Sequence, residues 1–395
     1  MSAPATSPQR LTDPRLIAIA CGNFVIGANS SLMIGLLNEV AQDLRISIPV
    51  AGQLIAAMSI STAISAPLLA FATAHLARRL VLSASLGMTA CCQLLSAVAP
   101  GFVVLMLARI LAGIPSASYT PAAAATGGML VSLEKRSQAI MTVGLGHSAA
   151  AIIGVPAGVF LGGLFGWRIA MLVFGVMAVV VVLWLLYVLP ARLPQAKLPS
   201  GALGVMLRNR GLTSTLAVTF AQGCGQFMLF SYIAPALKDL IGASTGTISL
   251  LMGWFGVCGL LGNLLGVKLI SRIGPTRMTF TGLAAIAMAH LVWPLGQFSA
   301  LAMPVAFTFW GLGFFALNSA LQVRLVLFAP ELGNLSVAFN TSLVFAGSAV
   351  AAATGGLIIA YIGIRAVSWF GLCILCGAAA LLWYSIRFDP RASRA

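Results

Sequence analysis

Charged side chains are too scarce in this chain to form the surface of a soluble protein. Asp, Glu, Lys and Arg make up 7% of its 395 residues, whereas a soluble domain has about 25%. The charges lie singly or in short groups between long uncharged stretches, and the mean hydropathy is +1.04. Lipid must therefore be the solvent for most of the chain.

Twelve apolar stretches are each long enough to cross a bilayer, which takes about 20 helical residues. They lie near residues 16–37, 49–72, 80–99, 102–131, 138–164, 168–189, 212–236, 246–268, 279–297, 301–323, 335–361 and 366–386. The sequence thus predicts an all-α integral membrane protein with twelve transmembrane helices.

Lys and Arg are distributed unequally between the two sides of the membrane that this assignment defines. If the N-terminus lies inside, 17 of them fall on the inner side and 4 on the outer side. The positive-inside rule then predicts a multi-pass protein of the cell inner (plasma) membrane with both termini in the cytoplasm. The net charge of +15 is spread singly between apolar runs, a pattern that does not fit nucleic-acid binding.

A basic, proline-bearing connection divides the twelve spans into six and six. We predict a cytoplasmic tail over 1–15, a six-helix bundle over 16–190, a cytoplasmic linker over 191–210, a second bundle over 211–387 and a tail over 388–395. A shift of 197 residues aligns GLFGWR, ending at Arg168, with AYIGIR, ending at Arg365. Two pseudo-symmetric six-helix bundles are a transporter architecture.

The fifth span contains a row of small residues. They recur every four positions, at Gly146, Ala150, Gly154, Gly158 and Gly162. On a helix this spacing predicts one face along which a neighbouring helix can approach backbone to backbone. Pro156 should bend the helix, because it lacks an N–H group.

Several segments resemble the antiporter branch of the major facilitator superfamily. GVPAG followed by GG is similar to its fifth-helix G-P-x-x-G signature, with Val155 between Gly154 and Pro156 as in the arabinose- and purine-efflux-like group. The segment 38–54, NEVAQDLRISIPVAGQL, resembles that group's first outer loop. The segment 108–113, ARILAG, resembles the fourth-helix arginine motif, and 226–237, QFMLFSYIAPAL, resembles the seventh helix. The resemblance covers essentially the whole chain and implies the major facilitator fold and exchange of substrate for protons.

The loop that gates transport in this family departs from the family pattern. Where the family has G-x-x-x-D-R-x-G-R-R, this chain reads AFATAHLARRL and keeps only Arg78 and Arg79. In the second half, Arg272 and Arg277 lie in the matching loop, and Ser271 stands where the acid would be. The resemblance implies that these four arginines form the gating loops.

Arg109 is the only Arg or Lys in the interior of a predicted span, away from its ends, and lies seven residues into the fourth. An arginine at the middle of a transmembrane helix costs roughly 2.5–3.5 kcal/mol on insertion scales. Two interpretations are open. Arg109 binds a polar or anionic substrate or shifts the pKa of a nearby acid, or it is a structural arginine that snorkels to the outer interface.

Titratable groups for proton coupling are few. None of the seven acidic residues lies at the middle of a span. Glu39, just beyond the first span, fits the family pattern best, although a solvated loop acid would look the same. His147 in the fifth span could also titrate near neutral pH. Glu39, Arg109 and His147 are therefore our proton-coupling candidates.

Uncharged polar residues recur on single faces of several spans. Our substrate-cavity candidates are Asn23, Ser30, Arg109, Gln222, Gln226, Asn318, Gln322 and Asn340. Amides at membrane depth suit hydrogen bonding to a neutral or weakly polar small molecule between the bundles. Hydrogen bonding between helices, worth about 0.6 kcal/mol each, explains the same residues without a ligand.

These features predict a secondary transporter. It exports a small organic solute (a drug, a sugar or a nucleoside-like compound) by alternating access, in exchange for protons. We expect a monomer that needs no metal or cofactor and has the solute, protons and membrane lipid as its partners. An uptake or facilitated-diffusion carrier is the alternative. A membrane enzyme or receptor fits less well, because no catalytic constellation is present.

Overall fold

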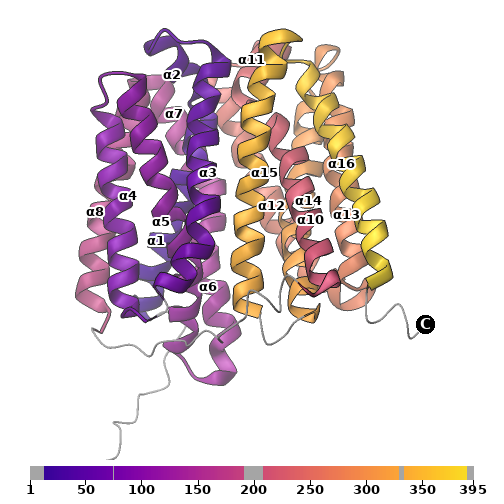
Figure 1. Ribbon diagram of the computed structural model, residues 1–395. Helices are drawn as coiled ribbons and strands as arrows, with labels where there is room; N and C mark the ends of the chain where they lie inside the picture. Colours follow the sequence, from indigo (N-terminus) through magenta and orange to yellow (C-terminus); the bar gives the residue numbers. More distant parts are fainter. Residues whose placement is uncertain (1–12, 74, 191–207, 329–332, 389–395) are drawn as a thin grey trace, which may run out of the picture.

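The computed structural model describes residues 13–73, 75–190, 208–328 and 333–388. Within these ranges the chain forms two helical bundles side by side, one from each half of the sequence (Figure 1). The predicted linker and both predicted tails lie mostly outside the described residues.

The first bundle comprises α1 (Pro14–Gly35), α2 (Leu37–Asp43), α3 (Ile48–Ala72), α4 (Arg78–Ala97), α5 (Phe102–Met129), η1 (Leu133–Lys135), α6 (Arg136–Ala149), η2 (Ala150–Gly154), α7 (Val155–Phe165) and α8 (Trp167–Val188). The second comprises α10 (Arg210–Phe230), α11 (Ile233–Ile241), α12 (Thr245–Ile273), α13 (Pro275–Val292), η3 (Trp293–Gln297), α14 (Ala302–Phe328), α15 (Gly333–Tyr361), α16 (Ala366–Ser385) and η5 (Ile386–Phe388).

The predicted membrane spans are confirmed. Eleven helices of the described chain are long and apolar enough to cross a membrane, and α10 with α11 forms a twelfth span that is bent by 45°. Large apolar side chains point outward along the spans, for example Leu183 at 62% exposure, as a lipid-facing surface requires. Three spans end later than predicted: the seventh at Ile241, α12 at Ile273 and α14 at Phe328.

Several helix ends follow directly from the sequence. Ser47 caps the start of α3 by accepting a hydrogen bond from the backbone N–H of Val50. Ser244 caps α12 in the same way with Thr247, as serine commonly does at an N-cap. Gly166 and Gly363 have φ values of 89° and 114°, which glycine adopts without strain. These two glycines stand 197 residues apart, so the internal repeat is visible in the backbone.

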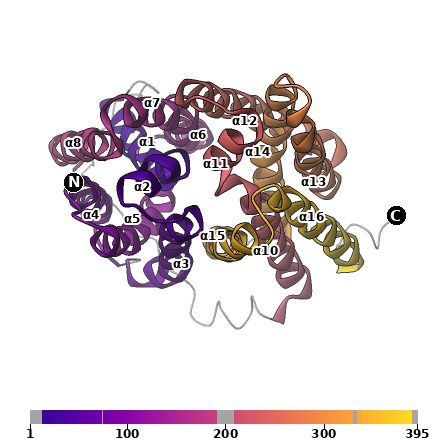
Figure 2. The same ribbon diagram turned by 90° about the horizontal axis from the view of Figure 1, so that it is seen from above.

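The bundles meet mainly along two sets of helices, and α11 also contacts α1 and α2. The first set is α3 and α15, which lie side by side at the centre of Figure 1; the second is α12 with α6, η2 and α7 (Figure 2). The helices α4, α8, α13 and α16 pack mainly within their own bundle. We call the side that carries α2 and α11 the α2 face, and the opposite side, where α1 begins, the terminal face (Figure 1).

Candidate functional site: the interface between the bundles

The glycine row of the fifth span packs against α1. A Cβ on Gly146 would lie 1.9 Å from the carbonyl oxygen of Ala20, and a Cβ on Gly158 would lie 2.1 Å from Leu32. Gly154 meets Phe24 and Gly162 meets Leu36 in the same register. The close helix interface expected from the sequence is therefore present, and its partner is a helix of the same bundle.

Pro156 changes the helix that contains it. The five residues before α7, Ala150–Gly154, form a π-helical turn, because proline cannot donate to the carbonyl four residues earlier. Ser249 of α12 donates a hydrogen bond of 2.7 Å to the Pro156 carbonyl. A Cβ on Gly256 would lie 2.6 Å from the Ala151 carbonyl oxygen. The irregular turn thus lies directly at the contact between the two bundles.

The second half repeats this packing. A Cβ on Gly27 in α1 would lie 2.9 Å from the Cβ of Ala150, and one on Gly347 in α15 would lie 2.7 Å from the backbone nitrogen of Cys224 in α10. These two contacts are related by the shift of 197 residues. Between the bundles, the hydroxyls of Ser59 and Ser348 lie 3.2 Å apart, and Ser342 donates to the Ala63 carbonyl.

At the α2 face the bundles are closely packed around Glu39. Its neighbours across the interface are Lys238 of α11 and Thr245 of α12, and a Cβ on Gly163 would lie 2.4 Å from Thr245. Burial raises the pKa of the Glu39 carboxyl, and Lys238 and Thr245 lower it by a smaller amount. The Glu39 Oε2 atom is buried without a hydrogen-bond partner. A cavity of about 550 Å³ begins beside Glu39 and extends to Arg168.

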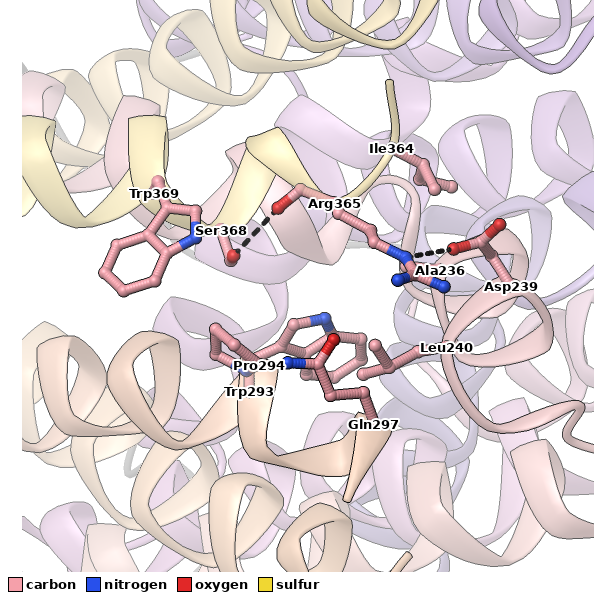
Figure 3. Close-up of a pocket in the computed structure, with 10 residues that line it drawn as sticks. All are labelled: Ala236, Asp239, Leu240, Trp293, Pro294, Gln297, Ile364, Arg365, Ser368 and Trp369. Carbon is pink, nitrogen blue, oxygen red and sulfur yellow. Dashed lines mark hydrogen bonds and ion pairs between the residues drawn. The ribbon is translucent and has the colours of Figure 1, made fainter. Parts of the chain in front are cut away.

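Two ion pairs occupy matching places at the α2 face. Arg168 pairs with Asp43, and Arg365 Nε lies 3.1 Å from Asp239 Oδ2. Figure 3 shows the second pair at the rim of a cavity of about 240 Å³, with Trp293 in its wall. Each pair joins helices of one bundle, so it braces that bundle rather than locking the two together.

Arg109 is buried inside the first bundle at 1% exposure. Its guanidinium donates to the Asn29 side-chain and backbone oxygens, at 3.5 and 3.3 Å, and to the Met58 sulfur. No described carboxylate forms an ion pair with it. The side chain does not snorkel to the interface, and it links α5 to α1 and α3.

A second buried arginine was missed by the sequence analysis. The predicted tenth span ends at residue 323, just before Arg324, but α14 extends past this arginine and leaves it 1% exposed. Its guanidinium donates to the Ser385 hydroxyl at 2.7 Å and lies over the Phe328 ring. The signal was available, because LVLF after Arg324 continues the apolar run.

His147 lies near the middle of the fifth span. Its ring is packed against Gly27 of α1, yet the residue is exposed. On the helix, His147 falls between the line of residues that faces α1 and the line that faces α12. Gly144, one turn closer to the terminal face, has open space where a Cβ would be. Open space therefore lies beside α6 at Gly144 in this half of the span.

The other cavity candidates fall into two groups. Asn23, Gln222, Gln226 and Asn340 are fully buried. Asn23 donates to the Val143 carbonyl at 3.1 Å, the two glutamines bond to each other, and Asn340 accepts from Thr219 at 2.8 Å. Ser30, Asn318 and Gln322 are half-buried. In this conformation only the second group is accessible.

The four loop arginines differ in their surroundings. Arg78 is buried at the start of α4, and Arg79 donates to the Leu186 carbonyl of α8. Arg272 and Arg277 are exposed on either side of Gly274, whose φ is 82°. The second half therefore keeps the glycine turn of this loop, and the first half, with Ala77 in the matching place, does not.

The fold, with its two related bundles and a polar interface at membrane depth, defines a secondary transporter. The chain matches the model of the Major Facilitator Superfamily over residues 19–343 and 215–395. It belongs to this family of membrane transporters.

Relatives span nearly the whole chain. Inner membrane transport protein YdhP of Escherichia coli (strain K12) is 31% identical over 382 residues, covering 95% of this chain and 96% of that protein. A probable sugar efflux transporter of Mannheimia succiniciproducens is 25% identical over 378 residues, which cover 95% of this chain and 94% of that protein. Among solved structures, a bacterial homologue of the human lysosomal transporter Spinster matches with a TM-score of 0.75 at 16% identity. It was solved in an inward-facing and unoccupied conformation, and the match covers 98% of this chain and 99% of that chain. The last likeness concerns the fold alone.

Proposed function

We propose that this protein exports a small organic solute across the cell inner membrane by alternating access, in exchange for protons, as a monomer. The terminal face lies in the cytoplasm, as the excess of Lys and Arg on that side supports. The relative from Mannheimia is a probable sugar efflux transporter, which supports export and a sugar-like solute.

One observation carries the proposal. The bundles touch at the α2 face, where Glu39 and Gly163 meet α11 and α12, while His147 and Gly144 border open space toward the terminal face. A transporter that alternates must close one side while the other is open. In this conformation the solute would enter from the cytoplasm.

Glu39 is the proton-coupling residue that the geometry supports best. It is half-buried with an unpartnered oxygen while the α2 face is closed, and it would become more exposed to water when that face opens. Because burial raises the pKa of Glu39 in the closed form, proton binding favours closure of the α2 face and proton loss favours its opening. Lys238 opposes protonation, and the nearby Asp43 is held by Arg168.

The remaining candidates take supporting roles. We assign solute contact to Ser30, Asn318 and Gln322, and a second protonation site in the cavity to His147. The buried Asn23, Asn340 and Arg109 hold helices together within each bundle, and Gln222 and Gln226 bond to each other within α10. Arg78, Arg79, Arg272 and Arg277 act as the loops that gate the terminal face.

Solute-driven proton movement tests the proposal. Purified protein is reconstituted into vesicles that contain a fluorescent pH indicator, and sugars and nucleosides, including arabinose and inosine, are added one at a time. Antiport predicts that at least one solute moves protons in the opposite direction, and that Glu39→Gln abolishes this response. Glu134→Gln, at an exposed acid near the terminal face, is the matched control and should leave it intact.

A facilitated-diffusion carrier is the second candidate. It is favoured by one observation, the lack of a carboxylate at mid-membrane depth in the described spans. Solute flux that is unchanged by uncouplers and by Glu39→Gln would establish this carrier and refute antiport.

A further inference from the structure

One face of α14, between its contacts with α10 and α12, carries an unusual combination of side chains. Phe314, Asn318 and Gln322 follow one another at intervals of four residues, and all three are half-buried. Phe314 faces α10, where its ring packs edge-to-face on Phe227 with the centroids 6.2 Å apart. Residues at this spacing share one side of a helix, so the two amides follow Phe314 toward the terminal face.

The neighbours of α14 show where this face points. Phe315 packs on α12 at Gly259, Ser319 bonds to Asn263 of α12 at 2.8 Å, and Leu317 packs on α13 at Gly282. Around the circumference of α14, Asn318 and Gln322 lie between Phe314, which contacts α10, and Phe315 and Ser319, which contact α12. Their side chains therefore point between α10 and α12.

Aromatic rings form an apolar wall at the end of this helix face that lies nearer the α2 face. Phe314 lies 5.8 Å from Phe255 of α12 and 4.9 Å from Phe315, and Phe230 of α10 packs on Phe255 at 5.0 Å. The cluster thus draws rings from α10, α12 and α14. Rings arranged edge-to-face leave flat faces on which another planar group can stack.

Hydrogen-bonding capacity remains just below this wall. Asn318 Nδ2 donates to the Phe314 carbonyl at 2.9 Å. Its Oδ1 atom and the Gln322 amide form no hydrogen bond with any described residue. These groups can accept from and donate to a ligand that stacks above them.

Charge selects further among ligands. The seven acidic residues of the chain all lie at or beyond the ends of the spans, so an organic cation would find no counter-ion at this depth. Arg109 and Arg324 are both buried at 1% exposure and engaged by neighbouring groups, so neither is available to an anion. An unpaired charge at membrane depth is costly.

We propose that the transported solute is an uncharged molecule with an apolar ring face, which stacks on Phe314 and Phe227 and hydrogen-bonds to Asn318 and Gln322. This inference rests on the proposed transport function, but it concerns the binding site alone. It separates this carrier from one that exports lipophilic cations.

Equilibrium binding to the purified protein, without any gradient, tests the inference. The probes are adenosine and three pyridines of the same size that differ in charge: nicotinamide, its cationic N1-methyl derivative and anionic nicotinate. Adenosine and nicotinamide should bind and raise the melting temperature, and the two ions should bind at least about fivefold more weakly.

Variants connect binding to the proposed residues. Phe314→Ala should weaken adenosine binding by about fivefold or more, whereas Phe309→Ala, at an outward-facing phenylalanine of the same helix, should not. Asn318→Leu provides a second test if Phe314→Ala does not fold. Preferred binding of the cation, no binding of either uncharged probe, or binding that survives both substitutions would overturn the inference. Binding without proton movement would refute the proposed antiport and leave this inference intact.

Discussion

A pair of alanine substitutions two residues apart on α6 tests the glycine interface. At Gly146, a Cβ would lie 1.9 Å from a backbone carbonyl of α1, and ordinary contact begins at 3.4 Å, so the helices must separate by about 1.5 Å. At Gly144, a Cβ would meet nothing within 4 Å. Both changes gain the same helix propensity, about 1 kcal/mol, but only Gly146→Ala overpacks an interface.

The expected difference follows from these distances. Overpacking costs about 1–3 kcal/mol, so Gly146→Ala should be less stable than Gly144→Ala by that amount. Thermal unfolding of both purified variants in the same detergent measures the difference, and transport by each in vesicles shows whether α1 has moved. Equal melting temperatures would refute the claim that α1 and α6 touch backbone to backbone.

Three further perturbations test other parts of the structure. Gly158→Leu should disrupt packing against Leu32 and abolish transport while labelling of the loops shows an unchanged topology; normal transport would contradict a tight row. Arg168 lowers the pKa of Asp43, so this half-exposed pair should add at most about 1 kcal/mol to stability. The contribution is present above the ordinary pKa of 3.8 and lost as pH falls below it; Asp43→Asn should remove it, and an unchanged melting curve at both neutral and acidic pH would show that the pair contributes nothing. A single cysteine at Arg45 in a cysteine-free background should react with an impermeant reagent added outside intact cells, and one at Lys135 should not; the reverse result would invert the orientation.

The spans and the repeat could be predicted because lipid imposes strong local constraints. A run of about 20 apolar residues has few alternatives to a helix, and a shift of 197 residues pairs Arg168 with Arg365, each beside a glycine of positive φ. The bend in the seventh span was not predicted, although Pro235 gives the signal, because proline cannot donate to the Ser231 carbonyl four residues earlier. The end of α14 was placed too early because Arg324 was treated as a boundary.

The candidate site was less predictable than the fold, because helix rotation decides which polar residue faces a neighbour. Gln222 and Asn318 are alike in sequence terms, yet one is fully buried and the other is half-buried. Glu39 shows the same limit. The sequence shows that Glu39 lies just beyond the first span, but its contact with Lys238 and Thr245 depends on how the two bundles meet.

Paired distance measurements test alternating access most directly, without knowledge of the solute. Spin labels at the exposed positions Gln42 and Thr247 span the α2 face, and labels at Glu134 and Arg272 span the terminal face; each pair is placed in a cysteine-free background and studied in lipid discs by pulsed electron resonance. Raising the pH through the range above 4.5, the ordinary pKa of Glu39, should lengthen the first distance and shorten the second, and Glu39→Gln should suppress both changes. Two distances that move together, or an α2 face that stays closed throughout, would contradict the account.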